Sequence, residues 1–352
     1  SETLTPFLDS LYTRSISFRN FYSAGIHTNH GLYATLYSFP AMMKRNLMKG
    51  SVIPRYSGLP TVLKENGYYN LFFMTHEGQY DNMNAFFRTN GYDEVFSQED
   101  YPADKVVNSF GVQDDFLYDY AIPVLNQRAA TGQPFFATLL SISNHPPYVI
   151  PPFFHPKTSE PETQIVEYAD WALRQFFEEA RKQPWFDNTI FVLEGDHGKL
   201  VGDAECELPE SYNHIPLMIY SSRIQPEEKT AFGGQVDIQP TILGLLNIDY
   251  LQNNFGVDLL KEERPCMFYT ADNMVVGRND TLLYLYNYET QQELTYDIGN
   301  GKLNAVPMDD SFLPLKEYSF SMLQSAEFLV KHGKTLNSIP FTPVSYTHLT
   351  LP

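Results

Sequence analysis

Cysteine is scarce in this sequence, and its scarcity excludes two ways of holding a protein together. The 352 residues include only Cys206 and Cys266. A disulfide framework and a cysteine-rich zinc site both need more thiols than this. A single bridge is allowed in an oxidising compartment, but the spacing does not pair the two. With 43% hydrophobic residues, the chain can instead bury a large core, as one α/β domain or as two smaller units.

Positive charge and long hydrophobic runs are also lacking. The 24 Lys and Arg residues against 42 Asp and Glu leave a formal net charge of −18, which excludes a nucleic-acid partner because its phosphates would be repelled. No apolar run approaches the length of a membrane span, and the first residues are not a signal peptide. We therefore expect a chain that is soluble as given. Residues 343–352 follow no pattern of their neighbours and are predicted to be a non-native tail.

Short apolar runs alternate with amphipathic stretches, which is typical of an α/β fold. No repeat, low-complexity tract or Gly/Ser-rich linker interrupts them. We expect a three-layer α/β/α sandwich around a largely parallel mixed sheet. The expected strands are Asn70–Thr75, Phe135–Ile142, Thr189–Glu194 and Leu217–Tyr220. The expected helices are Thr5–Arg14, Leu32–Phe39, Gly58–Asn66, Gly111–Asn126, Gln164–Gln183 and Asp237–Leu246.

After about Asn254 the pattern changes to short strands joined by polar turns. The expected strands there are Phe268–Tyr269, Met274–Arg278, Thr281–Tyr286 and Glu293–Asp297, followed by an amphipathic helix from Leu315 to about His332. This predicts a catalytic α/β domain over residues 1–254. A smaller α+β subdomain over residues 255–342 would pack on it.

The strongest local pattern is an apolar strand that ends in the sequence Glu194-Gly195-Asp196-His197-Gly198. Ligands bind at the carboxyl ends of strands in open α/β sheets. A carboxylate next to a neutral imidazole suits a borderline divalent metal such as Zn²⁺ or Mn²⁺. Taken alone, the same pair would more simply be an ordinary strand-to-loop turn.

A second pattern is the loop with Gly25 that runs into a helix whose first turn begins near Thr28. A hydroxyl there lies at the positive end of the helix dipole, beside free backbone N–H groups, which is a natural phosphate site. A metal on its oxygen would activate it for nucleophilic attack. Thr28 would equally serve as the N-cap of that helix, and the segment fits both roles.

Histidines stand at further strand borders. Asn144 and His145 follow one apolar strand directly, and His214 comes just before another. A lone histidine is more often a structural group than a ligand. Three of the nine histidines at the rim of one sheet, His197 included, favour a functional site.

These segments together resemble the lipoteichoic-acid-synthase and phosphoglycerol-transferase family, a sulfatase-like branch of the alkaline phosphatase superfamily. The similarity spans roughly residues 1–250, in consistent order. Its elements are Thr-Pro-Phe-Leu-Asp-Ser-Leu near the start, Gly-x-x-Thr-x-x-Gly-Leu at Thr28, Asn-His-x-Pro-Tyr at His145, Gly-Asp-His-Gly at Asp196, Asn-His-x-Pro-Leu at His214, and the segment from Gln235 through Asp237 to Pro240.

The resemblance implies roles for particular residues. Thr28 would be the nucleophile that accepts a phosphoglycerol group, and it would bind a divalent metal together with Asp196 and His197. Mn²⁺ is the metal expected, with Zn²⁺ or Mg²⁺ as alternatives. Asn144, His145 and His214 would contact substrate. His76 resembles a further substrate-side histidine, although an exposed loop histidine fits that position as well.

One departure from the family concerns an acidic metal ligand. The family carries it at the end of a first strand, upstream of Thr-Pro-Phe-Leu, and Glu2 is in the wrong context to replace it. We therefore expect the first strand and one of four protein ligands to be missing, and metal binding to be weakened. Transmembrane helices are also expected upstream, with the catalytic domain facing the periplasm or cell exterior.

The expected function is transfer of glycerol phosphate from a phosphatidylglycerol-like lipid to a glycan or glycolipid. A sulfatase is an alternative, but formylglycine sulfatases need Cys/Ser-x-Pro-x-Arg where this chain reads Thr28, Asn29, His30, Gly31 and Leu32. A phosphoethanolamine transferase or phosphodiesterase could use the same threonine and metal. An inactive sensor on the same fold is the non-enzyme alternative, against which the retention of Thr28, Asp196 and His197 argues.

Overall fold

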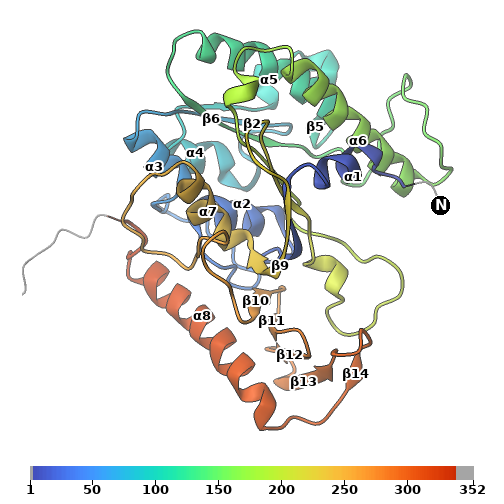
Figure 1. Ribbon diagram of the computed structural model, residues 1–352, viewed down its shortest axis with the longest axis vertical. Helices are drawn as coiled ribbons and strands as arrows, with labels where there is room; N and C mark the ends of the chain where they lie inside the picture. The colour runs from blue at the N-terminus through green and yellow to red at the C-terminus, as the bar shows by residue number, and fades with distance from the viewer. Residues whose placement is uncertain (1–2, 338–352) are drawn as a thin grey trace, which may run out of the picture.

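The computed structural model describes residues 3–337, and its central layer consists of two short β-sheets (Figure 1). The first sheet has the strand order β7-β8-β1-β9, and the second has the order β3-β2-β6. The first comprises β1 (Ile16–Tyr22), β7 (Phe191–Glu194), β8 (Leu217–Tyr220) and β9 (Glu227–Gly234). The second comprises β2 (Tyr69–Met74), β3 (Glu94–Phe96) and β6 (Phe135–Leu140). A small ribbon of β4 (Val106–Asn108) and β5 (Gly111–Val112) follows β3 in the chain.

Strand directions are mixed, as expected. β8 runs antiparallel to its neighbours β7 and β1, whereas β1 and β9 are parallel. All pairs of the second sheet are parallel. Parallel neighbours need crossover connections, which the helices between the strands provide.

Helices cover both faces of this layer (Figure 1). On one face α1 (Pro6–Tyr12), α5 (Asp114–Ala129) and α6 (Pro161–Ala180) share a buried core with β2 and β8. The other face carries α2 (Thr28–Tyr37), α3 (Leu59–Glu65), α4 (Met83–Thr89) and α7 (Ile238–Leu245). The three-layer α/β/α prediction is confirmed.

The sheet layer departs from the prediction in one respect, because it is divided. Within residues 3–337 no strand pairing joins β6 to β7, which stand at the facing ends of the two sheets. Both strands are apolar but half-buried or exposed along almost their whole length, whereas the β2 segment Asn70–Met74 is fully buried.

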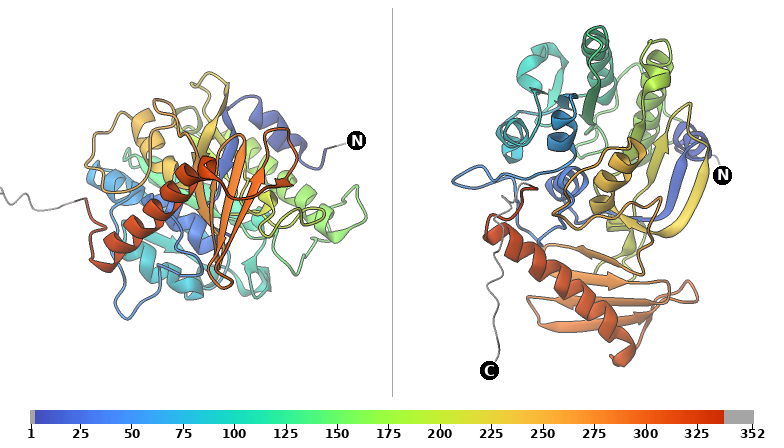
Figure 2. Two further views of the ribbon diagram at one scale, coloured as in Figure 1. Left: turned by 90° about the horizontal axis from the view of Figure 1, so that it is seen from below. Right: turned by 60° about the vertical axis from the view of Figure 1, so that its left-hand side comes forward.

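The part after Asn254 forms a separate antiparallel sheet with one long helix lying across it (Figure 2). Its strands are β10 (Met267–Thr270), β11 (Met274–Arg278), β12 (Leu282–Asn287), β13 (Gln292–Asp297) and β14 (Asn304–Ala305). The helix is α8 (Leu313–Lys331), which packs its Leu315 and Ser319 against Gly277 of β11. The predicted tail 343–352 lies outside the described residues, and Cys206 and Cys266 are both free thiols.

Several of the expected elements have other bounds in the structure, and some observed elements were not predicted. The helix expected over Leu32–Phe39 already begins at Thr28, and the one expected from Gly111 begins at Asp114, after β5. β1, β9 and α4 were not predicted. Each of these carries charged or amide side chains within the element, such as Arg19 and Asn20 in β1, and these residues hide the periodicity of the pattern.

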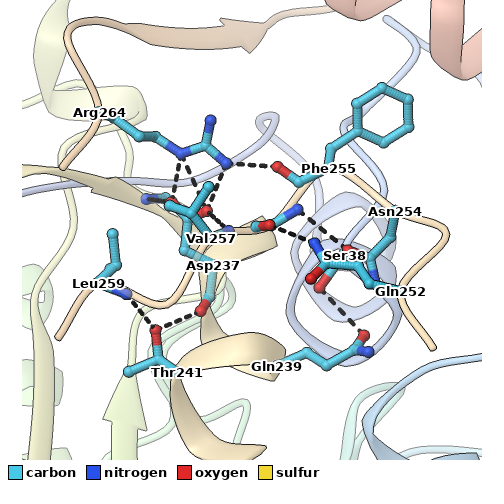
Figure 3. Close-up of polar contacts among 12 residues, drawn as sticks. Ser38, Asp237, Gln239, Thr241, Gln252, Asn254, Phe255, Val257, Leu259 and Arg264 are labelled. Atoms are coloured by element: carbon cyan, nitrogen blue, oxygen red, sulfur yellow. Dashed lines mark hydrogen bonds and ion pairs between the residues drawn. The ribbon is translucent and has the colours of Figure 1, made fainter. Parts of the chain in front are cut away.

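A buried ion pair ties the start of the C-terminal part to α7 (Figure 3). Asp237 is fully buried and accepts hydrogen bonds from Arg264 Nε at 2.8 and 3.0 Å. Its carboxylate also accepts from the backbone N–H groups of Gly234 and Val257, both at 2.9 Å. Because these contacts join residues 255–264 to the segment that leads into α7, they hold the start of the C-terminal part against the α/β layer.

Removing one partner of this pair should cost much of the stability. We expect Arg264→Met to lower the free energy of unfolding by about 3–5 kcal/mol, since Asp237 is left as an uncompensated buried charge. Urea unfolding followed by circular dichroism measures this. The control is Lys182→Ala, which breaks an exposed pair with Glu179 and should change stability by less than ~1 kcal/mol. Equal effects of the two substitutions would contradict the prediction.

Candidate active site

Thr28 and Asp196 meet where α2 begins and β7 ends. His27 is the N-cap of α2 and Thr28 is its first helical residue, so the interpretation of Thr28 as the N-cap is wrong. The Thr28 side chain instead donates a hydrogen bond to Asp196, with Oγ1 and Oδ2 2.6 Å apart. These two residues are 168 positions apart in the sequence. The fold thus brings a hydroxyl at a helix N-terminus against a carboxylate.

His197 completes this group. Its Nδ1 lies 2.7 Å from the carbonyl oxygen of Gly198, which can only accept, so Nδ1 carries the proton. The lone pair of Nε2 is therefore free, and Nε2 lies 3.5 Å from Asp196 Oδ2. A hydroxyl, a carboxylate and an imidazole nitrogen converge on one point.

These donors fit part of the coordination sphere of a divalent metal. Oxygen and neutral imidazole ligands suit Mn²⁺ or Zn²⁺. Across residues 3–337, however, no three His, Cys, Asp or Glu side chains are placed to hold a metal ion together. Asp196 and His197 therefore have no third acidic or imidazole partner in the described chain, and Thr28 supplies the remaining donor.

The contact between α2 and the end of β7 is unusually close. A Cβ atom added to Gly31, one helical turn after Thr28, would lie 2.5 Å from the backbone oxygen of Asp196. That oxygen also accepts a hydrogen bond from Gln235 Nε2 at 2.9 Å. Only glycine permits this approach, and the approach sets the position of Thr28 against Asp196.

Glu194 adds a second contact between α2 and β7, and no sequence motif singles this residue out. Its Oε1 accepts a hydrogen bond from Thr35 Oγ1 at 2.5 Å, two turns along α2 from Thr28. Its Oε2 is buried and has no hydrogen-bond partner among the described residues. Burial raises the pKa of Glu194 to about 8, and the nearby Asp196 carboxylate adds to the rise.

This raised pKa predicts a pH dependence of stability. In the unfolded chain Glu194 ionises near 4.5, whereas in the folded chain it stays protonated to about 8. Folding stability should therefore fall as the pH rises between those values. In Glu194→Gln that loss should vanish, so the free energy of unfolding of the variant relative to the parent chain should increase from about pH 5 to about pH 8. A difference independent of pH in urea titrations would contradict the assignment.

His76 lies at the carboxyl end of β2, and the alternative of an exposed loop histidine is wrong. The residue is 1% exposed, and burial lowers its pKa. Its Nδ1 lies 3.0 Å from the Glu77 carbonyl, and its ring lies 4.6 Å from that of Tyr80. Nε2 is buried with no hydrogen-bond partner in the described part of the chain.

Asn144 and His145 are exposed in the loop after β6. The His145 ring packs on Phe110 at 4.1 Å, and its Nδ1 donates to the carbonyl of Pro146 at 2.7 Å. In residues 3–337 no hydrogen bond joins either residue to Thr28, Asp196 or His197. Their proposed contact with substrate stays a prediction.

The backbone next to His214 lies beside the Asp196 turn, and the His214 side chain contacts β1. Gly198 N–H donates to the Tyr212 carbonyl at 2.8 Å, which places this segment beside the Asp196 turn. The His214 Nε2 donates to the Arg19 carbonyl at 2.7 Å, and the ring stacks on Tyr22. Its proposed contact with substrate stays a prediction.

Two histidines that the sequence reasoning did not select flank Thr28. His27 is exposed and ion-paired with Asp272, in the turn between β10 and β11, at 2.6 Å. His30 is fully buried, and burial with the neighbouring His27 lowers its pKa to about 4. Their positions one residue before and two after Thr28 could have drawn attention. The C-terminal subdomain thus contacts the residue that precedes the candidate nucleophile.

A sequence model of the sulfatase family matches residues 1–248. The chain belongs to the sulfatase family. Lipoteichoic acid synthase 1 of Bacillus subtilis is 26% identical over 270 residues, which cover 70% of this chain and 40% of that protein. Phosphoglycerol transferase I of Xanthomonas campestris is 25% identical over 295 residues, covering 78% and 42%. The chain spans less than half the length of either relative.

Solved structures agree with the family assignment. A member of the alkaline phosphatase superfamily from Vibrio parahaemolyticus matches with a TM-score of 0.84 and 27% identity, over 94% of this chain and 82% of that one. The lipoteichoic acid synthase LtaP from Listeria monocytogenes matches with a TM-score of 0.80 and 22% identity, over 94% and 86%. The resemblance to this family is confirmed, and at family level the chain is an enzyme. Within residues 3–337 no helix is both long and apolar enough to cross a bilayer.

Proposed function

We propose that this sulfatase-family enzyme transfers glycerol phosphate from a phosphatidylglycerol-like lipid to a glycan or glycolipid, with Thr28 as nucleophile and a divalent metal as cofactor. The observation that carries the proposal is the 2.6 Å contact between Thr28 Oγ1 and Asp196 Oδ2 at the N-terminus of α2. The names of the two relatives, a lipoteichoic acid synthase and a phosphoglycerol transferase, support the substrate class.

The reaction has two displacements. In the first, Thr28 Oγ1 attacks the donor phosphorus, the bond from phosphorus to the diacylglycerol oxygen breaks, and that oxygen takes up a proton. In the second, an acceptor hydroxyl attacks the phospho-threonine and gives its proton to the histidine that served as the acid in the first step, the bond from phosphorus to Thr28 Oγ1 breaks, and the threonine hydroxyl is restored. Asp196 would take the hydroxyl proton of Thr28 in the first step and return it in the second, and the 2.6 Å distance between Oδ2 and Thr28 Oγ1 supports this role.

Several features of the chain support the phosphoryl chemistry. Thr28 stands in the first turn of α2, a helix of ten residues, where the dipole and free N–H groups favour negative charge. Thr28, Asp196 and His197 would hold the metal, which we expect to be Mn²⁺, with Zn²⁺ or Mg²⁺ as alternatives. A divalent ion there supplies Lewis-acid polarisation of the phosphoryl oxygens and lowers the pKa of the hydroxyl. His145 or His214 would serve as the general acid for the leaving group, with Asn144 and His76 on the substrate side.

Sulfate esters are a poor fit despite the family name. The residue in the nucleophile position is Thr28, and a formylglycine can be made only from cysteine or serine. Neither Cys206 nor Cys266 begins a Cys-x-Pro-x-Arg segment. The lipid donor implies a cell-membrane enzyme whose catalytic domain faces the periplasm or cell exterior.

The test is turnover of fluorescent phosphatidylglycerol by the full-length gene product loaded with Mn²⁺. We expect release of diacylglycerol, and peptide mass spectrometry should find a glycerol phosphate adduct on Thr28. An adduct that appears only with phosphatidylethanolamine would indicate a phosphoethanolamine transferase instead. Release of diacylglycerol with no adduct on any residue would indicate direct hydrolysis and contradict the proposal.

A further inference from the structure

A hollow lies between the β4–β5 ribbon and the loop after β6, lined by side chains from residues 107–113 and 142–149. We infer that this hollow binds a neutral sugar unit of the acceptor, and that Gln113 and Phe110 select it. The assignment to the acceptor rests on the proposed function, whereas binding of the sugar itself does not. The inference is carried by a buried acceptor atom without a partner, an aromatic face and a lining without charged side chains.

The size of the hollow suits one small unit of a ligand. Its empty space is about 240 Å³, with the open side included. Pockets for drug-sized molecules usually hold about 300–1,000 Å³, and in them a few polar groups on apolar walls fix the orientation of the ligand. A single sugar ring is therefore a better match here than a longer chain.

Gln113 supplies an acceptor that no donor satisfies. The residue is 8% exposed, and its Nε2 donates a hydrogen bond to the Val149 carbonyl at 2.9 Å. That bond fixes which end of the amide is the nitrogen, so the other end is the acceptor Oε1. Oε1 is buried and has no hydrogen-bond partner in the part of the chain that the structure describes. Because an unpaired buried acceptor is costly, a ligand hydroxyl that donates to Oε1 would be bound favourably.

His145 and Phe110 complete the recognition surface. The His145 Nδ1 donates to the Pro146 carbonyl, so in the neutral ring Nε2 is a second acceptor. Phe110 packs on the His145 ring at 4.1 Å and is itself only half-buried. Sugar hydroxyls can donate to the two acceptors while the C–H face of the sugar packs on the phenyl ring. Two acceptors beside an aromatic face thus match the chemistry of a sugar.

The lining argues for a neutral ligand. None of the described residues that line the hollow is Lys, Arg, Asp or Glu. A phosphate group in a protein is normally held by Arg, Lys or several N–H donors. The hollow therefore suits a polyhydroxyl group rather than a phosphate. The glycerol end of a lipid headgroup shares this chemistry, and the kinetic experiment below separates it from a sugar.

The hollow adjoins the candidate site on the side of His197. Tyr148, in the loop that lines the hollow, accepts a hydrogen bond from Lys199 Nζ at 3.0 Å. Lys199 follows His197 by two residues. The ribbon is held in place by the end of β2, since the Val112 N–H donates to the Thr75 carbonyl at 3.2 Å. Both walls of the hollow are therefore attached to the carboxyl ends of strands.

A second set of contacts leads from the hollow to Thr28. The Phe110 ring lies 6.4 Å from that of Tyr80. The next residue, Asp81, accepts a hydrogen bond from Asn29 Nδ2 at 3.3 Å, and Asn29 follows Thr28 directly. A sugar bound in the hollow would therefore lie next to the site on two sides, as an acceptor must.

Ligand-observed NMR tests the binding step without the reaction. The probe is methyl β-D-glucopyranoside, added to the 352-residue chain, and we expect saturation transfer to the sugar. Gln113→Met keeps the length of the side chain and removes Oε1, so the Kd should rise at least ~5-fold. The matched control is Gln133→Met, which removes an exposed bond of the same kind, from Nε2 to the Gly67 carbonyl at 3.0 Å, and should leave the Kd unchanged. No transfer to the sugar with the parent chain, or equal Kd values for the two variants, would overturn the inference.

Phe110→Leu gives an independent measurement that leaves the bond from Gln113 to Val149 in place. Loss of the ring face should weaken sugar binding, and the melting temperature should stay close to that of the parent chain because Phe110 is only half-buried. The control is Phe328→Leu, which changes an exposed ring on α8 and should not affect binding. Equal sugar binding by the two leucine variants would overturn the role of Phe110.

Steady-state kinetics of the full-length protein with Mn²⁺ assign the hollow to one substrate. In Gln113→Met, the KM for methyl β-D-glucopyranoside as acceptor should rise at least ~5-fold, with the KM for phosphatidylglycerol unchanged. The reverse pattern would assign the hollow to the donor headgroup and overturn the inference. Absence of any transfer by the parent protein would contradict the proposed function, whereas the NMR result decides sugar binding separately.

Discussion

Replacing Thr28 with alanine is expected to reduce glycerol phosphate transfer by the full-length protein at least ~10³-fold, since the variant has no oxygen to attack the donor phosphorus. The hydroxyl makes its hydrogen bond with Asp196 and is half-buried, so the fold should survive the change. Diacylglycerol release from fluorescent phosphatidylglycerol measures the effect. The melting temperature of the variant should stay close to that of the parent protein.

The matched control is Thr28→Ser, which keeps an oxygen at the same place. It should retain most of the activity and should carry the glycerol phosphate adduct on residue 28. Diacylglycerol release that is unchanged in Thr28→Ala would contradict the nucleophile assignment. Equal losses in the alanine and serine variants, with no adduct on either, would show that the hydroxyl does not act as a nucleophile.

Gly31→Ala is expected to reduce turnover by about 10²-fold although residue 31 touches no substrate. The added methyl would lie 2.5 Å from the Asp196 backbone oxygen and 3.0 Å from Gln235 Nε2. The backbone oxygen cannot move aside cheaply, so α2 must shift and carry Thr28 away from Asp196. A displacement of about 1 Å at a reacting group costs roughly 10² in rate. The loss should appear in kcat more than in KM, because the added methyl displaces the candidate nucleophile.

At an exposed glycine in a helix, substitution by alanine would have the opposite effect on stability. Glycine to alanine in a helix interior normally stabilises by about 1 kcal/mol. A Gly31→Ala protein with unchanged turnover and a raised melting temperature would therefore show that α2 and β7 are not as close as described. A lowered melting temperature with reduced kcat is the result that the geometry predicts.

Much of the fold could be predicted from apolar runs. The helices and strands that were missed contain polar residues within their own sequence. β2, β6 and β8 were predicted because each is a continuous apolar run between helices. β9 begins with Glu227, Glu228 and Lys229 at the edge of its sheet, where one side faces solvent and hydrophobic side chains are not required. The expectation of a missing first strand did not say between which strands the layer divides, since strand pairing depends on contacts between distant segments.

The sequence predicted which residues form the candidate site, but not how their side chains are arranged. The order of motifs selected Thr28, Asp196 and His197, and the structure brings all three together. In residues 3–337 no hydrogen bond or ion pair joins His145 or His214 to these three residues, so their roles stay predictions. The contact between Thr35 and Glu194 was missed since neither residue belongs to a recognisable motif.

The ion pair between His27 and Asp272 bears on how this protein could be divided or recombined. The turn that carries Asp272 lies beyond residue 254, yet its carboxylate sits against the residue that precedes Thr28. An exchange of C-terminal parts between related proteins at that boundary would alter the charge beside the candidate nucleophile. A functional exchange between relatives would therefore have to include the turn that carries Asp272 along with the α/β layer. We expect residues of this turn to co-vary with those at the start of α2.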